Sequence, residues 1–432
     1  MIHLTRSIDL EDEFLKSILR RGRVEVEAVE KDVRSIVEAV RTRGDDALFE
    51  YTERLDGAII NSNTVKATKE DIDAAYNLAK EAEIKALERA ASNIERFHKM
   101  QLERLDFRES GRGITLGVVA RPIPAVGVYA PGGKASYPSS VLMCAVPAKA
   151  AGVERLVVCS PPSPRNRFNP YILLASDIAG VDEIYCVGGA QAIAAMAYGT
   201  KTLRSVDKIV GPGNIYVNAA KQLLSRYVSI DLPAGPSEIL IVADESAKPE
   251  FIAADLLAQA EHDENAVCIL LTNSENVAYD VQERLSEMTS GRPPKLETIR
   301  GALEKNGLIV TVKDLKEATT LANQIAPEHL VIMTRKPRSV LKAVRNAGLV
   351  FLGSYSPVAI GDYSAGTNHV LPTGGYALTY SGLSVRDFLK TISYIDCSRK
   401  GLKNLAQTTI TLAEIEGMWA HSKSIQVRDV QE

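Results

Sequence analysis

The sequence AVGVYAPGG at residues 125–133 is a short β-branched run that ends in a loop rich in glycine and proline. Similar runs follow it: RLVVCSPP (155–162), EIYCVGGAQ (183–191), DKIVGPGN (207–214) and EILIVAD (238–244). Helical stretches separate the runs, and their spacing of about 25–30 residues is typical of βαβ units. This part of the chain therefore predicts a parallel sheet with crossover helices.

A second series of apolar runs predicts a second α/β unit. Its members are AVCILLT (266–272), GLIVTV (307–312), EHLVIMT (328–334) and GLVFLG (348–353). Residues 11–105 are charged and helix-periodic, and predict two or three amphipathic helices broken near Gly57 and at 61–63. Residues 401–428 predict a final helical tail. The expected division is an N-terminal helical segment at 1–110, two parallel-sheet domains at 111–245 and 246–380, and a C-terminal helical tail at 381–432.

Composition and charge narrow the class of protein. The chain has 432 residues, of which 45% are hydrophobic and 24% are charged, which is ordinary usage for a globular protein of about two or three domains. A net charge of −3 gives no electrostatic reason to expect nucleic acid or an anionic membrane as a partner. The N-terminus lacks the basic start followed by an apolar stretch that a secretory signal needs. No apolar run is long enough to predict a membrane span.

The five cysteines lie far apart, and most sit inside apolar runs. This pattern predicts reduced, buried thiols in a cytoplasmic protein, without a CxxC pair for zinc or redox chemistry. Cys159, at the end of a predicted strand, is the best candidate if one of them acts as a nucleophile.

Three loops of the first domain are rich in glycine: PGG (131–133), GGAQ (188–191) and GPGN (211–214). Ligands of open parallel sheets bind beyond the carboxyl ends of the strands, where glycine lets the backbone approach a phosphate and a helix N-terminus favours an anion. None of the three is a GxGxxG, the usual dinucleotide fingerprint. Alone, such loops are more often tight βα turns than nucleotide contacts, and both interpretations stay open.

A first candidate pair lies in the predicted helix at residues 250–264. Gln259 and His262 are three positions apart and therefore share one helix face. An imidazole and an amide oxygen could supply half of a mixed nitrogen and oxygen metal site. The alternative is an ordinary polar helix end.

A second candidate pair is Glu328 and His329 in APEHL (326–330). Pro327 ends the preceding helix, so the pair lies at a corner between a helix and a strand, where adjacent side chains can face one cleft. A glutamate beside a histidine supplies two proton acceptors near neutral pH. The alternative is an exposed acid beside a capping histidine.

Two further clusters combine a carboxylate with a histidine. Residues 361–375 predict a long irregular loop, a typical place for function, in which Asp362 is a hard anionic ligand candidate and His369 could contact a substrate. In the tail, Glu416 and His421 are five positions apart and would not share a narrow stripe of an unbroken helix. Four of the six histidines therefore lie near carboxylates in polar settings.

Eight motifs, in this order, resemble the histidinol dehydrogenase family. They are VGVYAPGG, GGAQAIAA, VGPGNIYV, LPAGPSEILIVAD, LLAQAEH, APEHL, GDYSAGTNHVLPTGG and EGMWAH. The resemblance covers residues 115–425 and is highly specific for the superfamily, whereas the N-terminal helices are less distinctive. It implies two Rossmann-like domains that are incomplete, which would account for the missing GxGxxG.

The resemblance also implies a role for single residues. One zinc ion per subunit would be held by Gln259, His262, Asp362 and His421. The catalytic proton acceptors would be Glu328 and His329. The substrate would contact Ser237, Gln259, His262, His329, Asp362, Glu416 and His421. The NAD contacts would be Tyr129, Gln191 and Asn214, on the three glycine-rich loops.

The implied reaction is the NAD-dependent, zinc-assisted oxidation of L-histidinol through L-histidinal to L-histidine, the last step of histidine biosynthesis. The implied assembly is a homodimer in which Glu416 and His421 complete the partner's active site. Three alternatives stay open from the residues. They are a zinc-dependent NAD dehydrogenase of another small polar alcohol such as a sulfonated diol, an aldehyde oxidation through a thiohemiacetal on Cys159, and a non-catalytic nucleotide- or metal-binding subunit.

Overall fold

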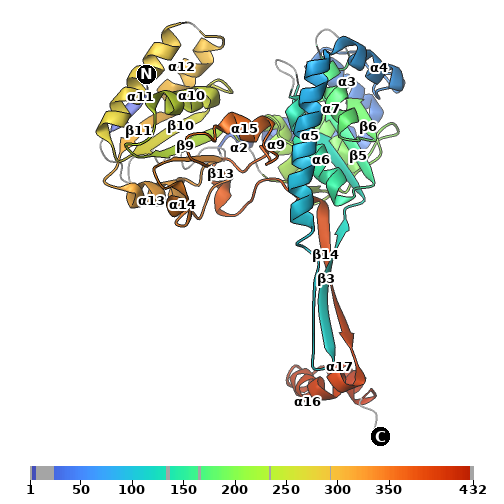
Figure 1. Ribbon diagram of the computed structural model, residues 1–432. Coiled ribbons are helices and arrows are strands. Elements are labelled where there is room, and N and C mark those ends of the chain that lie inside the picture. The colour runs from blue at the N-terminus through green and yellow to red at the C-terminus, as the bar shows by residue number, and fades with distance from the viewer. Residues whose placement is uncertain are drawn as a thin grey trace.

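Two parallel sheets with their helices, and a long arm that projects away from both, make up the chain (Figure 1). The computed structural model describes residues 2–5, 24–132, 137–163, 167–232, 235–291 and 293–428. The start of the predicted N-terminal helices, at residues 11–23, therefore lies outside the described residues, as does Gly133 of the first glycine-rich loop.

The first sheet has five parallel strands in the order β6-β5-β4-β7-β8. The strands are β4 (Ala125–Tyr129), β5 (Arg155–Ser160), β6 (Glu183–Cys186), β7 (Lys208–Val210) and β8 (Ser229–Ile230). The helices between them are α6 (Pro138–Ala151), α7 (Pro170–Ile178), α8 (Gly189–Tyr198) and α9 (Ile215–Leu224). The predicted βαβ units of this part of the chain are confirmed.

Helices cover both faces of this sheet, which is why its strands are apolar throughout instead of alternating with polar residues. In β5, Leu156 and Val158 belong to the core beneath α6 and α7, whereas Val157 and Cys159 belong to the core beneath α8 and α9. This division follows from the alternation of side chains along a strand.

The N-terminal helices extend these two cores. Helices α4 (Lys69–Leu78) and α5 (Glu81–Leu102) pack on the α6 side, and α2 (Val24–Arg43) and α3 (Asp45–Asp56) pack on the α8 side. The described part of this segment thus holds four helices where the periodicity predicts two or three. Gly57 ends α3 in a left-handed conformation with φ +69°, which explains the break expected there.

The second sheet has six parallel strands in the order β1-β11-β10-β9-β12-β13. The strands are β1 (His3–Thr5), β9 (Glu238–Ala243), β10 (Val267–Thr272), β11 (Gly307–Thr311), β12 (His329–Met333) and β13 (Leu349–Leu352). One face packs on α10 (Pro249–Ala260), α11 (Glu275–Ser290) and α12 (Leu296–Asn306), and the other on α13 (Leu315–Ile325) and α14 (Pro337–Leu341). The predicted fold class, two parallel-sheet α/β domains, is confirmed.

Two strands lie outside the segment to which the sequence assigned them. Strand β9 falls within the predicted first domain at 111–245 but pairs with β10 and β12 in the middle of the second sheet. Strand β1 falls within the predicted helical segment at 1–110 but pairs with β11. The pairings of β9 with β12 and of β1 with β11 join segments far apart in the chain, which local periodicity does not reveal.

The arm is a three-stranded antiparallel sheet that carries two helices at its end (Figure 1). Its strands are β2 (Phe107–Gly111), β3 (Ile114–Pro122) and β14 (Leu389–Cys397), and its helices are α16 (Arg399–Ile415) and α17 (Trp419–Gln426). The predicted tail at 381–432 is therefore only partly helical, because β14 pairs with β3 along its whole length. Among the described helices, none combines the length and apolar character needed to cross a membrane.

A buried ion pair supports the loop that follows β7. Lys221 of α9 and Asp231 after β8 form an ion pair in which their side chains are 2% and 1% exposed. Lys221 Nζ donates to the carbonyl oxygen of Gly211 over 3.0 Å, and the amide of Gly211 donates to Asp231 Oδ2 over 2.7 Å. Gly211 has φ +114°, and a Cβ there would meet the Tyr129 carbonyl oxygen at 2.2 Å, so only glycine fits.

We expect Lys221→Met to lower the free energy of unfolding by about 3–5 kcal/mol, because it leaves Asp231 charged and buried without its partner. Urea denaturation of the purified chain measures this loss. Lys85→Met is the matched control, since Lys85 pairs with Glu81 on the surface and should change the midpoint little. Equal losses in the two variants would contradict the prediction.

Candidate active site

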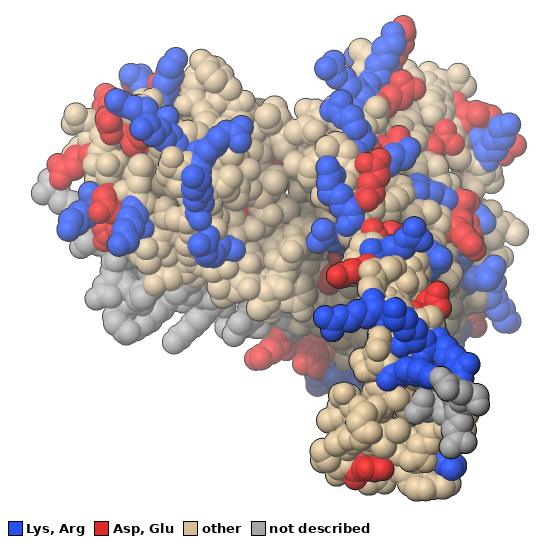
Figure 2. All heavy atoms as spheres, turned by 60° about the horizontal axis from the view of Figure 1, so that its bottom comes forward, with Lys and Arg blue, Asp and Glu red and all other residues tan. Residues whose placement is uncertain are grey.

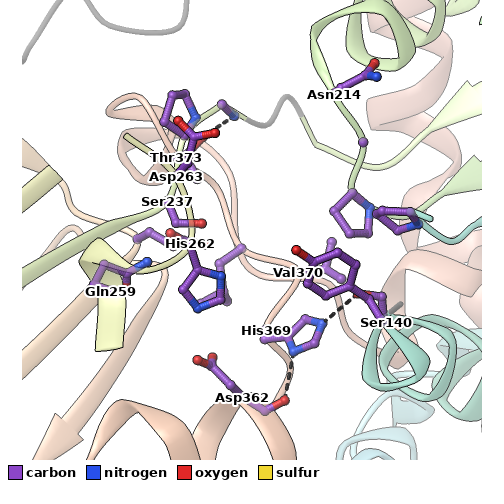
Figure 3. Close-up of a pocket in the computed structure, with 18 of the residues that line it drawn as sticks. Ser140, Asn214, Ser237, Gln259, His262, Asp263, Asp362, His369, Val370 and Thr373 are labelled. Carbon is purple, nitrogen blue, oxygen red and sulfur yellow. Dashed lines mark hydrogen bonds between the residues drawn. The ribbon is translucent and has the colours of Figure 1, made fainter. Parts of the chain in front are cut away.

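A cavity of about 540 Å³ lies between the two parallel sheets (Figure 3). The five-stranded sheet faces it with the carboxyl ends of its strands, through Asn214 after β7. The six-stranded sheet faces it with the opposite, amino ends of its strands, through Ser237 before β9 and Glu328 and His329 at the start of β12. The cavity thus gathers side chains from both domains.

The corner before β12 positions Glu328 and His329 as the sequence predicts. Helix α13 ends at Ile325 and is capped by Ala326, a non-glycine residue with φ +50°, and the chain then enters β12 through Pro327. Both side chains are buried, at 5% and 4% residue exposure, so the alternative of an exposed acid and a surface capping histidine is wrong.

The hydrogen bonds of His329 define the state of its ring. Nδ1 lies 3.0 Å from the carbonyl oxygen of Glu238, which can only accept, so Nδ1 carries the hydrogen. In the neutral ring Nε2 is then the bare nitrogen, and it lies 3.4 Å from Asp362 Oδ1. Glu328 Oε2 lies 3.5 Å from His329 Nδ1 and accepts the amide of Glu238 over 2.7 Å.

Burial and charge shift both titrating groups of the pair. Burial raises the pKa of the Glu328 carboxyl to about 8. Burial lowers the pKa of His329, but the carboxylates of Glu328 and Asp362 outweigh it and raise that pKa to about 9. Glu328 supports a charged imidazole only while it is itself ionised, so the two shifts are linked.

Gln259 and His262 reach the cavity from the end of α10. The helix ends at Ala260, earlier than the predicted 264, because Asp263 Oδ1 accepts the amide of Asn265 over 2.7 Å in a local turn that competes with the helix. His262 lies in the turn that follows, where its amide still donates to the Gln259 carbonyl oxygen over 3.3 Å. Both side chains line the cavity.

Asp362 lies on a short helix, α15 (Val358–Tyr363), where the sequence predicted an irregular loop. His369 lies in the loop itself and is held by two contacts. Its Nδ1 donates to the Asp362 carbonyl oxygen over 2.8 Å, and its Nε2 lies 3.3 Å from Ser140 Oγ of α6. The side chains of His262, Asp362 and His369 point into the same space (Figure 3).

The donor set at this point fits a metal ion that binds nitrogen and oxygen. Asp362 Oδ1 is buried, accepts no hydrogen bond among the described residues and has His329 Nε2 at 3.4 Å as an ion-pair partner, whereas buried polar atoms normally form a hydrogen bond. Gln259 and His262 add an amide oxygen and an imidazole, a set that suits zinc. Among the described residues, no group of three or more His, Cys, Asp or Glu is placed to hold a metal ion.

The predicted fourth ligand is not in this cavity. His421 lies on α17 and Glu416 just after α16, both exposed and at the far end of the arm (Figure 1). Gly417, with φ +70°, ends α16 and separates the two residues, as their poor helical spacing suggested. One chain by itself thus presents Gln259, His262 and Asp362.

The three residues predicted to contact NAD lie at the carboxyl edge of the five-stranded sheet. Tyr129 is buried, and its hydroxyl accepts the amide of Gly189 over 3.1 Å. Gln191 is buried in α8, with Nε2 3.2 Å from Asp56 Oδ2 and with Oε1 lacking a hydrogen-bond partner among the described residues. Asn214 caps α9 through the amide of Val217 and, of the three, is the one that lines the cavity.

The cysteines do not support a nucleophile. Cys159 is fully buried in β5, is not among the cavity-lining residues, and burial raises the pKa of its thiol. The expectation of buried thiols holds for Cys144, Cys159, Cys186 and Cys268. It is wrong for Cys397, which lies on the exposed strand β14 of the arm.

Sequence reasoning missed Glu238, a glutamate that is 1% exposed at the start of β9. Its carboxylate and its backbone both contact the Glu328–His329 corner. The signal was present, because a charged residue at the head of the apolar run ILIVA must find buried partners. Ser140 was also missed, since nothing in α6 marks it.

Together, the fold and the cavity define a two-domain α/β enzyme with a buried acid–base pair beside a set of nitrogen and oxygen donors. The chain belongs to the histidinol dehydrogenase family, whose family model, "Histidinol dehydrogenase", matches residues 19–429. The predicted resemblance is therefore confirmed.

Individual relatives are similar along their whole length. The histidinol dehydrogenase of Methanothermobacter thermautotrophicus is 49% identical over 414 residues, which cover 96% of each chain. That of Caldanaerobacter subterraneus subsp. tengcongensis is 49% identical over 430 residues, or 99% of this chain and 98% of that protein. The crystal structure of histidinol dehydrogenase from Elizabethkingia anophelis superposes with a TM-score of 0.94 at 37% identity, covering 99% and 98% of the two chains.

Proposed function

We propose that this chain oxidises L-histidinol to L-histidine through L-histidinal, with NAD as the oxidant, in the last step of histidine biosynthesis. The observation that carries the proposal is the buried pair Glu328 and His329, which shares one cavity with Gln259, His262 and Asp362. This pair supplies the two proton acceptors that successive alcohol and aldehyde oxidations require. We also propose the cytoplasm as its location, where four buried thiols would stay reduced.

The cofactors follow from the same residues. Gln259, His262 and Asp362, with the partner subunit's His421, would hold one zinc ion per subunit, and Tyr129, Gln191 and Asn214 would contact NAD. When bound, zinc would supply positive charge that orients the amine and imidazole nitrogens of the substrate, and NAD would accept hydride. Ser237 and His329, together with Glu416 of the partner subunit, would add contacts to the substrate.

His329 would move the proton in the first oxidation. Its Nδ1 is committed to the Glu238 carbonyl oxygen, so Nε2 would take the proton of the substrate hydroxyl as hydride leaves the carbon. Loss of the proton and the hydride turns the alcohol into the aldehyde.

Glu328 would act in the second oxidation. It would remove a proton from water as the water oxygen adds to the aldehyde carbon. His329 would then deprotonate the hydrate while the second hydride leaves, which yields the carboxylate. His329 would release its first proton before the second oxidation. The overall balance is one histidinol, one water and two NAD⁺ consumed for one histidine, as the carboxylate, with two NADH and three protons formed.

Titrating the enzyme with L-histidinol and excess NAD tests this reaction. We expect two NADH per histidine formed, because both oxidations occur in one cavity. A ratio of one would remove the second oxidation from the proposal. If NADH forms faster from a sulfonated diol than from L-histidinol, the proposed substrate is wrong and the sulfonated diol is favoured.

Substitutions in the pair separate the two steps. We expect His329→Asn to slow both oxidations and Glu328→Gln to slow mainly the oxidation of added L-histidinal, each by about 10²–10⁴-fold. Stopped-flow measurement of NADH from either substrate distinguishes the steps. Wild-type turnover of L-histidinal by Glu328→Gln would contradict the role given to Glu328.

The arm supports a homodimer with shared sites. Figure 2 shows the end of the arm covered largely by uncharged side chains. The arm exposes large apolar side chains, among them Ile395 of β14 at 74% and Ile415 and Trp419 of its helices at 75% each. An apolar surface of this kind is typical of a protein contact. We therefore propose that each arm reaches its partner and delivers Glu416 and His421 to the partner's cavity.

A mixed dimer tests this sharing. We expect Asp362→Ala and His421→Ala to be inactive as separate homodimers. A mixed dimer of the two, isolated with two affinity tags, should regain about half the wild-type activity and one zinc per dimer, because one of its two symmetric sites is intact.

The matched control is the mixed dimer of Asp362→Ala and His262→Ala, in which both sites stay broken because both changes lie in the cavity of their own chain. Elemental analysis gives the zinc content in each case. An inactive Asp362→Ala and His421→Ala mixed dimer, or a fully active monomer, would contradict the shared site.

A further inference from the structure

Glu238 contacts the catalytic corner in two separate ways. Through its backbone, its amide donates to Glu328 Oε2 over 2.7 Å and its carbonyl oxygen accepts from His329 Nδ1 over 3.0 Å. Through its side chain, Oε2 accepts the amide of Glu328 over 3.3 Å and Oε1 accepts the amide of Gly374 over 2.6 Å. The carboxylate therefore bridges two backbone amides from different segments.

The Glu238 carboxylate joins the wall of the cavity, at Gly374, to the corner that carries Glu328. Gly374 belongs to the loop that follows His369, and its neighbour Thr373 lines the cavity. Thr373 Oγ1 accepts the amide of Gly235 over 2.5 Å, which ties the same loop to the segment before β9. A shift of the Glu328 backbone away from the cavity would break the hydrogen bond from its amide to the Glu238 carboxylate.

Stability alone does not explain a carboxylate here. Glu238 is 1% exposed, and the rest of β9 is apolar. A buried charge costs free energy that its hydrogen bonds only offset, whereas a well-packed apolar residue often stabilises as much. What an apolar side chain cannot supply is two acceptors aimed at two amides.

We propose that Glu238 is a positioning residue for Glu328, and that its carboxylate holds Glu328 where water is activated in the aldehyde step. This inference rests on the proposed function. The side chain of residue 238 does not hold His329, because His329 bonds to a backbone carbonyl that any residue would provide. The two oxidations should therefore respond differently to a change of this side chain.

Glu238→Gln tests the inference, because an amide keeps one acceptor and turns a donor toward the second amide. We expect kcat for added L-histidinal to fall by about 10–100-fold, with KM little changed, since a small displacement of a reacting group has effects of this size. The first hydride transfer from L-histidinol, followed by stopped flow, should stay within a few-fold of wild type. Equal slowing of both steps would overturn the inference.

The double variant Glu238→Gln/Glu328→Gln gives a readout that a purely structural role would not produce. If Glu238 acts through Glu328, the double variant should oxidise L-histidinal no more slowly than Glu328→Gln alone. Losses that multiply would overturn the inference. If Glu328→Gln itself oxidises L-histidinal at the wild-type rate, the role proposed for Glu328 fails, and the role of Glu238 fails with it.

Two further variants complete the test. Glu245→Gln is the matched control, because Glu245 lies just past the other end of β9 and pairs with Arg335 on the surface, and we expect wild-type rates in both steps. Glu238→Asp replaces the Gln variant if thermal melting shows that the latter does not fold. It keeps both acceptors on a shorter side chain, so it should show the same difference between the two steps, and equal slowing of both would again overturn the inference.

Discussion

The parallel pairing of β9 with β12 is the constraint on which the reactive groups depend. Its register aligns His329 with Ile239, so the amide and carbonyl groups of residue 238 face the first residues of β12. A shift of this register would turn the side chains of β12 to the other face of the sheet. It would also remove the acceptor that fixes the ring of His329. A long-range backbone pairing thus decides which nitrogen of the neutral His329 ring is bare.

The residues of the proposed site come from two kinds of structure: the packed walls of the cavity and the projecting arm. The cavity residues stand at the ends of buried strands and helices, where the packing of two cores holds them. Glu416 and His421 lie instead at the far end of the arm, whose strand β14 packs on the core beneath α6 and α7 at its first residue, Leu389. Side chains such as Trp419 are exposed there, so an isolated chain leaves apolar surface in water.

Local sequence was sufficient where an element depends on its own residues. The βαβ series and the Glu328–His329 corner followed from β-branched runs, Pro327 and the order of the polar residues. Local sequence was insufficient where a strand pairs with another strand far away in the chain. Strand β14 was assigned to a helical tail, because its partner β3 lies more than two hundred and fifty residues earlier.

Other predictions were wrong because one local structure formed in place of the one predicted. Helix α10 ended early at the turn made by Asp263, and Asp362 formed part of a short helix inside a glycine-rich segment. Glu238 could have been flagged as a buried charge, but its partners Glu328 and Gly374 come from segments that only the folded chain brings together. The domain boundaries and the individual roles of the site residues stay predictions.

The opposite strand ends that face the cavity give it an electrical polarity. On the side of the five-stranded sheet, α6 and α9 begin at the cavity, so their amide groups point into it. On the other side, α10 ends there, so its last carbonyl groups do. Each helix end carries a partial charge of roughly half an elementary charge, positive at its start and negative at its end. The backbone alone therefore favours an anion on one wall and a cation on the other, before any side chain is counted.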